Sequence, residues 1–418
     1  MPSVPPSSGG RRRSRAWIPL ASLVKRRLAA AFLGIVAAIA AAEGALRAAR
    51  ISHPVFRRPD AVLGWSNIPG SLGEWHQEGH SVVSINADGL RDGDHARAKE
   101  EGVLRIAVIG DSYAEAFQVN EDEAFWAVME TGLQARGVNK GRVEVINFGV
   151  SAFGTAQELL MLRHKALAYD PDVVLLAVTT GNDLRNNLRA LDRNHLRPYF
   201  DLQEDGSLVL DDAFRTDPEF RDWMRPVRRW ERAVFNRSRF LQILRHLRAA
   251  PDREAAEAIR QADRAAGIRS VVYAGRPPGI DDWIYVPPVV PVMERAWNVT
   301  EALIAEIQRE CEAAGARFVL VVLTNPIQVH PDPAVRHAFR ATAGLSDLFY
   351  PGKRLAELGR RTGFPVLDLA PDLQRYVERN QVFLHGFPDR LLGDGHWNIE
   401  GHNSGGQAIA AWLGGLLE

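Results

Sequence analysis

The chain has 418 residues, in which 51 Lys and Arg balance 51 Asp and Glu, so its formal net charge is zero. That balance argues against a nucleic-acid-binding protein, which normally carries a strong basic excess. The single cysteine, Cys311, excludes an internal disulfide bond and a cysteine-based metal cage. The length allows one large domain or two smaller ones.

The N-terminal part has the pattern of a membrane anchor. Residues 1–27 are rich in Pro, Ser and Gly and then basic, which predicts a disordered cytoplasmic tail. The apolar run from Leu28 to Leu46 approaches the about 20 residues that a spanning helix needs, so we predict a transmembrane signal-anchor over 28–49. The basic cluster before it predicts that the C-terminal body is exported. A signal peptide cleaved after Ala42 and a buried helix of a soluble protein are the alternatives.

Residues 50–100 read as an irregular segment that packs on the main domain, with turn clusters around a short strand at Val82–Ile85. His76 and His80 are four residues apart, a spacing that would make a metal pair on a helix. Gly79 and the strand-like continuation argue against a helix, so we expect no metal site there.

From residue 103 onward, short apolar runs alternate with helical patterns. The predicted strands are Val103–Ile109, Val143–Phe148, Val173–Val178, Arg317–Leu323 and Pro365–Leu369. The predicted helices lie near 122–136, 155–168, 294–315, 352–362 and 403–416. This alternation predicts a parallel sheet with helices on both faces.

The alternation stops between residues 200 and 290, so the predicted domain consists of 101–199 and 291–418. The intervening stretch is polar and rich in Arg and Pro, with one amphipathic pattern at Val227–Leu247. We interpret it as an insertion that forms a cap or a partner surface.

Ser112 is the first candidate catalytic residue. It follows Gly110 and Asp111 directly after the first predicted strand, and open α/β sheets bind ligands at the carboxyl ends of their strands. A serine hydroxyl there could act as a nucleophile if a base activates it. Asp111 is expected to fix the turn through hydrogen bonds to backbone N–H groups.

Three further stretches are predicted to reach the same edge of the sheet: Asn147–Gly154, Thr179–Asp183 and Gly393–Asn398. Together with Gly110–Ser112, they resemble the conserved blocks of the SGNH (GDSL-type) esterase and acylhydrolase superfamily. Further segments resemble the membrane-anchored, bacterial envelope branch of that superfamily; they are Gly64-Trp65, Ile85–Asp92, Thr155–Leu159 and Pro171–Val174. The resemblance covers about 60–200 and 294–418.

The resemblance implies a three-layer α/β/α, flavodoxin-like fold with a five-stranded parallel sheet. It implies Ser112 as nucleophile, His396 as base and Asp394 as the acid that orients the imidazole. The oxyanion donors would be the Ser112 N–H, an N–H of the second block at Gly149 or Ala152, and the Asn182 amide.

Two positions depart from the pattern of the superfamily. Ala152 stands where its oxyanion glycine is expected, and Gly393 stands where its acid, three residues before the histidine, is expected. Polysaccharide acetyltransferases and deacetylases of this superfamily are similar in having the Asp-x-His spacing of Asp394 and His396. Ser151 lacks a nucleophile-elbow context and is interpreted as a turn serine.

The predicted function is a serine-dependent ester hydrolase that acts through an acyl-enzyme on Ser112, on an O-acylated envelope or secreted glycan. An O-acetyltransferase to a polysaccharide hydroxyl and a non-catalytic, membrane-anchored glycan- or assembly-binding protein are the alternatives. The expected partners are an ester substrate, the membrane and a protein bound through 200–290, without nucleic acid, cofactor or metal. The expected location is the bacterial inner membrane, with a single span and a periplasmic body.

Overall fold

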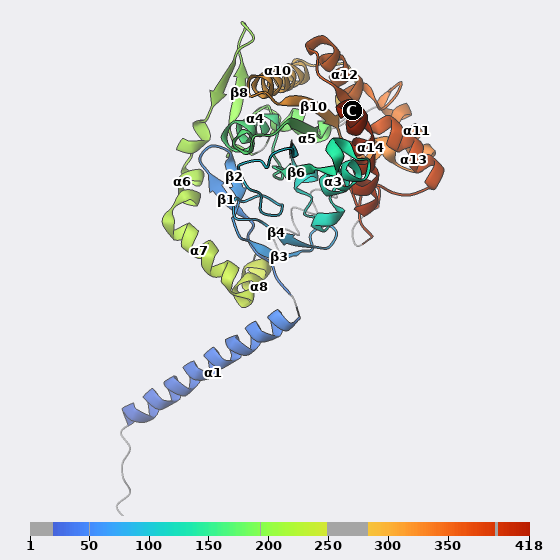
Figure 1. Cartoon of the computed structure of the whole chain (residues 1–418). Coiled ribbons are helices and arrows are strands. Elements are labelled where there is room, and N and C mark those ends of the chain that lie inside the picture. The colour runs from blue at the N-terminus through green and yellow to red at the C-terminus, as the bar shows by residue number, and fades with distance from the viewer. Residues whose placement is uncertain (1–19, 50, 193, 249–282, 389–391) are drawn as a thin grey trace, which may run out of the picture. The chain divides into compact units, whose positions relative to one another are not determined.

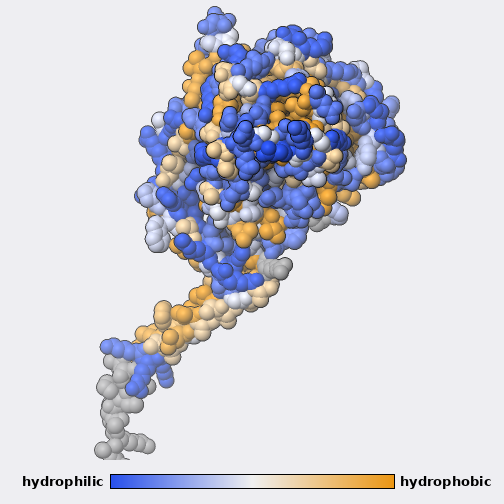
Figure 2. Space-filling view, viewed as in Figure 1, coloured by the Kyte–Doolittle hydropathy of each residue, from blue (hydrophilic) through white to orange (hydrophobic). Residues whose placement is uncertain are grey.

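The computed structural model describes residues 20–49, 51–192, 194–248, 283–388 and 392–418. The chain forms two units, Met1–Ile51 and Ser52–Glu418. In the first unit, α1 (Leu20–Ala48) begins eight residues before the predicted span. Its segment Val24–Ala48 has 25 residues and is long and apolar enough to cross a membrane. Apolar side chains cover most of its length, and hydrophilic ones lie at its N-terminal end (Figure 2). Residues 1–19 of the predicted tail lie outside the described residues.

The second unit, the body, is built on the predicted parallel sheet. Its strands are β5 (Leu104–Gly110), β6 (Val143–Asn147), β7 (Val173–Val178), β10 (Arg317–Val322) and β11 (Val366–Asp368). Their order is β11-β10-β7-β5-β6, and every neighbouring pair is parallel. This is the flavodoxin-like order, in which the sheet reverses its direction of growth between β5 and β7. The predicted fold class is therefore confirmed.

Helices cover both faces of this sheet, because successive side chains of a strand point to opposite faces. Ala107 and Ile109 of β5 join one buried apolar cluster, and Ile106 and Val108 join the other. The first cluster is covered by α4 (Thr155–His164), α10 (Pro291–Ala313), α11 (Pro333–Ala343) and α12 (Tyr350–Thr362). The second is covered by α3 (Phe125–Ala135), α13 (Ala370–Asn380) and α14 (Ile399–Leu417), and Figure 1 shows α3 and α14 side by side. Short helices are α2 (Ser112–Glu115), α5 (Thr180–Asn186), η1 (Glu121–Glu123), η2 (Val138–Gly141), η3 (Ala166–Tyr169), η4 (Ala213–Thr216), η5 (Trp283–Tyr285) and η6 (Pro326–Val329).

The segment before the sheet is more regular than predicted. It forms two antiparallel hairpins, β1 (Arg57–Asp60) with β2 (Gly64–Asn67), and β3 (Leu72–Trp75) with β4 (Ser81–Ser84). Only β4 was predicted, because strands of four residues leave little periodicity to detect. Phe56, Val83, Ile85 and Phe117 form a small buried cluster, which fixes the second hairpin against the loop that follows α2.

The predicted insertion begins with a hairpin, β8 (Tyr199–Leu202) and β9 (Leu208–Asp211), followed by α6 (Pro218–Met224), α7 (Pro226–Arg237) and α8 (Arg239–Arg248). The single helix predicted at 227–247 is broken at Ser238, whose backbone is extended (φ −119°, ψ 117°). Asn236 Oδ1 accepts from the Val55 N–H at 2.8 Å, and Gln242 Oε1 accepts from the His53 N–H at 2.9 Å. The insertion thus binds the N-terminal segment. Residues 249–282 lie outside the described residues, and the role as a cap or partner surface remains a prediction.

Arg105 is buried at the start of β5 and ties three surrounding segments to the sheet. Its guanidinium donates to Glu144 Oε2 at 2.7 Å, to the Arg97 and Ala96 carbonyls at 3.0 Å each, and to the Tyr169 carbonyl. Replacing it by Met would remove the donor from the buried Tyr169 carbonyl and from three partly buried acceptors, and the buried guanidinium would be lost from the Glu144 pair. We expect Arg105→Met to lower the free energy of unfolding by about 3–5 kcal/mol.

Thermal unfolding of the detergent-solubilised chain measures this loss. Arg309→Ala is the matched control, because Arg309 pairs with Glu306 but is 70% exposed, and an exposed pair contributes about 0–1 kcal/mol. Equal melting temperatures for Arg105→Met and Arg309→Ala would contradict the assignment.

Candidate active site

Ser112 lies at the reversal point of the sheet, immediately after β5. Asp111 precedes α2, and its Oδ1 accepts from the Tyr113 N–H at 2.9 Å, as predicted for a turn-fixing residue. Asp111 is fully buried, and burial raises the pKa of its carboxyl. Ser112 is therefore the first residue of α2, where a backbone N–H has no acceptor within the helix.

His396 reaches Ser112 from the loop before α14. Its Nε2 lies 2.8 Å from Ser112 Oγ. Its Nδ1 lies 2.5 Å from Glu78 Oε2, and its backbone N–H donates to Glu78 Oε1 at 2.7 Å. A carboxylate can only accept from Nδ1–H, which leaves Nε2 without a proton and free to accept from the serine hydroxyl.

Glu78 also changes the pKa of the His396 imidazole. Burial disfavours the imidazolium, but the hydrogen bond to Glu78 and its negative charge outweigh that effect and raise the pKa of His396 above its ordinary value. For Glu78, burial favours the neutral acid, and the hydrogen bond and charge of His396 outweigh it, so the pKa of Glu78 is lowered. The pair therefore favours a carboxylate beside a ring that gains a proton readily.

The assignment of Asp394 as the orienting acid is corrected by this geometry. Asp394 Oδ1 accepts from the Gly395 N–H at 2.9 Å, and Glu78 occupies the Nδ1 side of His396. Gly395 makes the approach possible, because a Cβ at this position would overlap Glu78 Oε1. Its φ of +85° also favours glycine. Asp394 thus shapes the loop, while Glu78 contacts the ring.

A buried network holds the backbone of the His396 loop. Trp397 Nε1 donates to Thr324 Oγ1 at 2.8 Å, so the Thr324 hydroxyl can donate to His385 Nε2, also at 2.8 Å. The remaining His385 proton is then on Nδ1 and is donated to the Gly395 carbonyl at 2.9 Å. Burial lowers the pKa of His385 to about 4, so this ring remains neutral where His396 titrates.

The candidate oxyanion donors divide into available and occupied groups. The Gly149 N–H donates to Asn147 Oδ1 at 2.8 Å, so Gly149 has a structural role and is a poor donor to an oxyanion. Ala152 has a left-handed φ of +62° and is exposed, and no described group accepts from its N–H. A left-handed alanine costs about 1–2 kcal/mol, so Ala152 is strained at the position where the superfamily is expected to have glycine.

Asn182 lies in α5, after β7, and its amide is oriented by two partners. Nδ2 donates to Asp111 Oδ2 at 2.8 Å, and Oδ1 accepts from Arg185 Nη2 at 3.3 Å. One N–H of the amide is thus used by Asp111, and the second N–H remains to bind an oxyanion.

The Asn147–Gly154 turn is attached to α2 through side chains. Asn147 Nδ2 donates to the Ala114 carbonyl at 2.9 Å and to the Arg91 carbonyl at 3.1 Å. Ser151 Oγ donates to the buried carboxylate of Glu115, which also accepts two hydrogen bonds from Arg57. Ser151 is therefore a turn serine held away from the catalytic role, as interpreted from the sequence.

One surface depression and two groups of potential metal ligands lie apart from the Ser112–His396–Glu78 group. A surface depression enclosing about 300 Å³ contains neither Ser112 nor His396; its lining residues are Ala61, Arg215, Phe220, Arg221, Met224 and Arg225. Within the described ranges, two clusters have the ligand types of a metal site, Glu74–His76–His80 and His195–Asp217–Glu219. Neither cluster includes a residue of the Ser112–His396–Glu78 group.

No protein-family model and no curated relative matches the chain. Among solved structures, it is similar to an α/β hydrolase enzyme from the metagenome of Lake Arreo, with 13% identity over 75% of this chain and 96% of that one, at a TM-score of 0.35. It is similar to the acetyl xylan esterase AlAXEase, with 11% identity, 74% and 98% coverage and a TM-score of 0.35. It is also similar to an acetylxylan esterase from Geobacillus stearothermophilus, with 10% identity, 76% and 96% coverage and a TM-score of 0.36. These likenesses are too remote to carry an argument about activity, so the function must be argued from the site itself.

Proposed function

We propose that the chain is a serine esterase that uses Ser112, His396 and Glu78 as its catalytic triad. The observation that carries the proposal is the continuous hydrogen-bonded line from Ser112 Oγ through both nitrogens of His396 to Glu78 Oε2, with distances of 2.8 and 2.5 Å. Three residues from distant parts of the chain meet in the order that serine nucleophiles require.

In the proposed acylation step, Ser112 Oγ attacks the carbonyl carbon of an ester while His396 Nε2 takes the hydroxyl proton. Glu78 stabilises the imidazolium that forms. The tetrahedral intermediate then expels the alcohol, which receives the proton from Nε2. The result is an acyl group bound to Ser112 and a neutral His396.

The negative oxygen of the intermediate needs donors that are in place before the reaction. The Ser112 and Ala152 backbone N–H groups and the second N–H of Asn182 are the proposed donors. Asp111 connects two of these parts, because it caps the helix of Ser112 and accepts from the amide of Asn182. This replaces the predicted set in one respect, since Gly149 is left out.

In the proposed deacylation step, His396 removes a proton from water, which attacks the acyl group and regenerates Ser112. A sugar hydroxyl in place of water would make the protein an O-acetyltransferase. The sequence argument for that alternative used the Asp-x-His spacing, and it weakens once Glu78 takes the position beside the ring. We therefore favour hydrolysis.

The proposed substrate is an O-acylated glycan outside the cytoplasm. The argument is location: α1 is long and apolar enough to hold the body at a membrane, and the basic residues before it favour an exported body. A glycan-binding protein without catalysis is the rival explanation, and labelling of the serine distinguishes the two.

A fluorophosphonate probe should label the chain at pH 8 through Ser112, because only an activated hydroxyl reacts readily. We expect Ser112→Ala to abolish labelling and Ser151→Ala to retain it, as read by in-gel fluorescence and peptide mapping. A wild-type chain that stays unlabelled would favour the non-catalytic binder.

Glu78→Gln should lower kcat for p-nitrophenyl acetate by on the order of 10⁴-fold, the loss seen when a triad acid becomes an amide. The neutral form of His396 is the base, so activity is lost as pH falls through its raised pKa. Removing the carboxylate removes the cause of that raised pKa, so the acidic limb of residual activity should move to lower pH.

Asp394→Asn is the matched control for Glu78→Gln, because it changes a neighbouring carboxylate by the same atom replacement. We expect it to retain activity within about tenfold and to keep the wild-type pH profile. A larger loss of activity in Asp394→Asn than in Glu78→Gln would indicate that Asp394 is the acid of the triad.

Asn182→Ala should reduce kcat by about 10²–10³-fold with little change in KM, since an oxyanion donor acts mainly in the transition state. Ala152→Gly is the companion variant, because it keeps the N–H and relieves the left-handed φ. It should retain turnover. A loss confined to KM in Asn182→Ala would place this amide in substrate binding instead.

A further inference from the structure

The β3–β4 hairpin gathers two histidines and a carboxylate at one point outside the proposed triad. Glu74 lies on β3, and His76 and His80 belong to the turn that leads into β4. Glu74 Oε2 is 3.1 Å from His76 Nε2 and 3.3 Å from His80 Nε2. The two rings stack with their centroids 4.6 Å apart.

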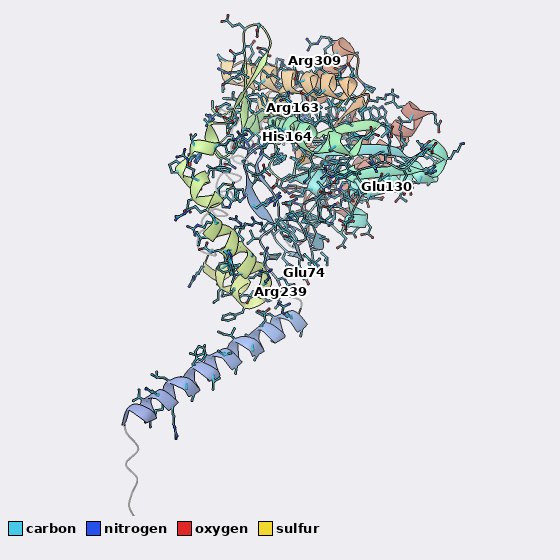
Figure 3. All side chains as sticks on the ribbon, turned by 60° about the vertical axis from the view of Figure 1, so that its left-hand side comes forward. Glu74, Glu130, Arg163, His164, Arg239 and Arg309 are labelled. Atoms are coloured by element: carbon cyan, nitrogen blue, oxygen red, sulfur yellow. The ribbon has the colours of Figure 1, made fainter. Side chains whose placement is uncertain are left out.

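The sequence argument against this pair assumed that residues four apart need a helix to meet. The hairpin turn achieves the same result, because it reverses the chain between the two histidines. Gly79 supports the reversal with a left-handed φ of +65°. Figure 3 shows Glu74 at the same end of the body as Arg239, the first residue of α8.

These distances match those of a metal site. A tetrahedral ion with bonds of about 2.0–2.1 Å holds its ligand atoms about 3.3–3.4 Å apart. The carboxylate oxygen lies at close to this separation from both imidazole nitrogens, and all three atoms lie within 4.8 Å of one another. The distances fit an ion, and its binding would require the two stacked rings to turn so that both Nε2 lone pairs point at it.

The ligand types and the exposure narrow the choice of ion. Imidazole nitrogen favours zinc and neighbouring transition metals over magnesium and calcium, which prefer all-oxygen sites. The His76 and His80 side chains are 43% and 64% exposed, so an ion can enter from solvent, while the Glu74 side chain is only 19% exposed. His53 lies close, with its ring 6.4 Å from that of His76, and it stacks on His246 of α8.

We propose that Glu74, His76 and His80 bind a divalent transition-metal ion of the zinc class. Two imidazoles and one carboxylate leave a fourth position to water. The ion would clamp the turn that carries Glu78, since Glu78 lies between the two histidine ligands. This second consequence rests on the proposed function: a fixed turn keeps the Glu78 carboxylate against His396 and raises ester turnover.

Binding is tested with Co²⁺, whose visible absorption reports a tetrahedral site independently of any activity. The full-length chain, purified in detergent without a histidine tag and treated with chelator, should develop this absorption with a single cobalt ion and lose it when Zn²⁺ displaces cobalt. The double variant His76→Gln/His80→Gln should weaken cobalt binding by about 100-fold or more.

His195→Gln is the matched control, because it removes the only imidazole of the second cluster, whose His195 Nε2 to carboxylate distances are longer, at 3.5 and 3.7 Å. It should leave the absorption unchanged. Absence of a tetrahedral spectrum in the wild type, or an unchanged spectrum in the double variant, would overturn the site. A far-UV circular dichroism spectrum and a melting temperature like those of the wild type show that the double variant is folded.

The proposed effect of the ion on ester turnover is measured separately from metal binding. Zn²⁺ should raise kcat for p-nitrophenyl acetate in the wild type and leave the double variant unaffected. Ser112→Ala should bind cobalt normally and have no turnover, so a failure of the esterase proposal and a failure of the metal site give different results. Metal binding without any change in wild-type turnover would overturn the clamp.

Discussion

The hydrogen bond between Glu78 and His396 joins two parts of the body that the sheet alone would not bring together. Glu78 lies on a hairpin near the start of the body, 318 positions before His396. Its two oxygens hold both the ring and the backbone N–H of the histidine, so they fix the position of the residue as well as the tautomer of its imidazole. The alignment of Nε2 with Ser112 follows from this contact.

The sheet supplies the other half of the site through its topology. β5 and β7 are neighbours at the reversal point, so the residues that follow them, Ser112 and Asn182, meet at one edge. Asp111 then ties them together, because it accepts from both the α2 backbone and the Asn182 amide. This buried carboxyl has three hydrogen-bond donors, Thr179 among them, and keeps Ser112 and the Asn182 amide in one arrangement.

The sequence predicts the part of the site that this topology controls. Each strand of the sheet is a buried apolar run, so its end could be located, and the segments of Ser112 and Asn182 could be placed at one edge. The roles of Asn182 and His396 were implied by the resemblance to the SGNH superfamily. Glu78 follows a strand of four residues with mixed burial, and no periodicity marks its neighbourhood. Asp394 was assigned instead because its Asp-x-His spacing is similar to that of polysaccharide acetyltransferases and deacetylases, but its carboxylate accepts from the Gly395 N–H. A carboxylate that is distant in sequence, Glu78, contacts the His396 ring, and the sequence around it gives no indication of this contact.

The β3–β4 hairpin is short, but its turn carries the carboxylate that contacts the His396 ring. Ser112 and Asn182 depend for their positions on the deeply buried sheet, whereas Glu78, the proposed orienting acid, depends on a short turn exposed to solvent. The contact between Glu78 and His396 also requires glycine at position 395, because a side chain there would overlap Glu78 Oε1. His396, the proposed base, is thus held on one side by a buried, neutral network through His385 and on the other by a solvent-exposed turn. If the proposed triad is correct, the position of Ser112 is fixed by the sheet, while the basicity of His396 depends on the conformation of one hairpin.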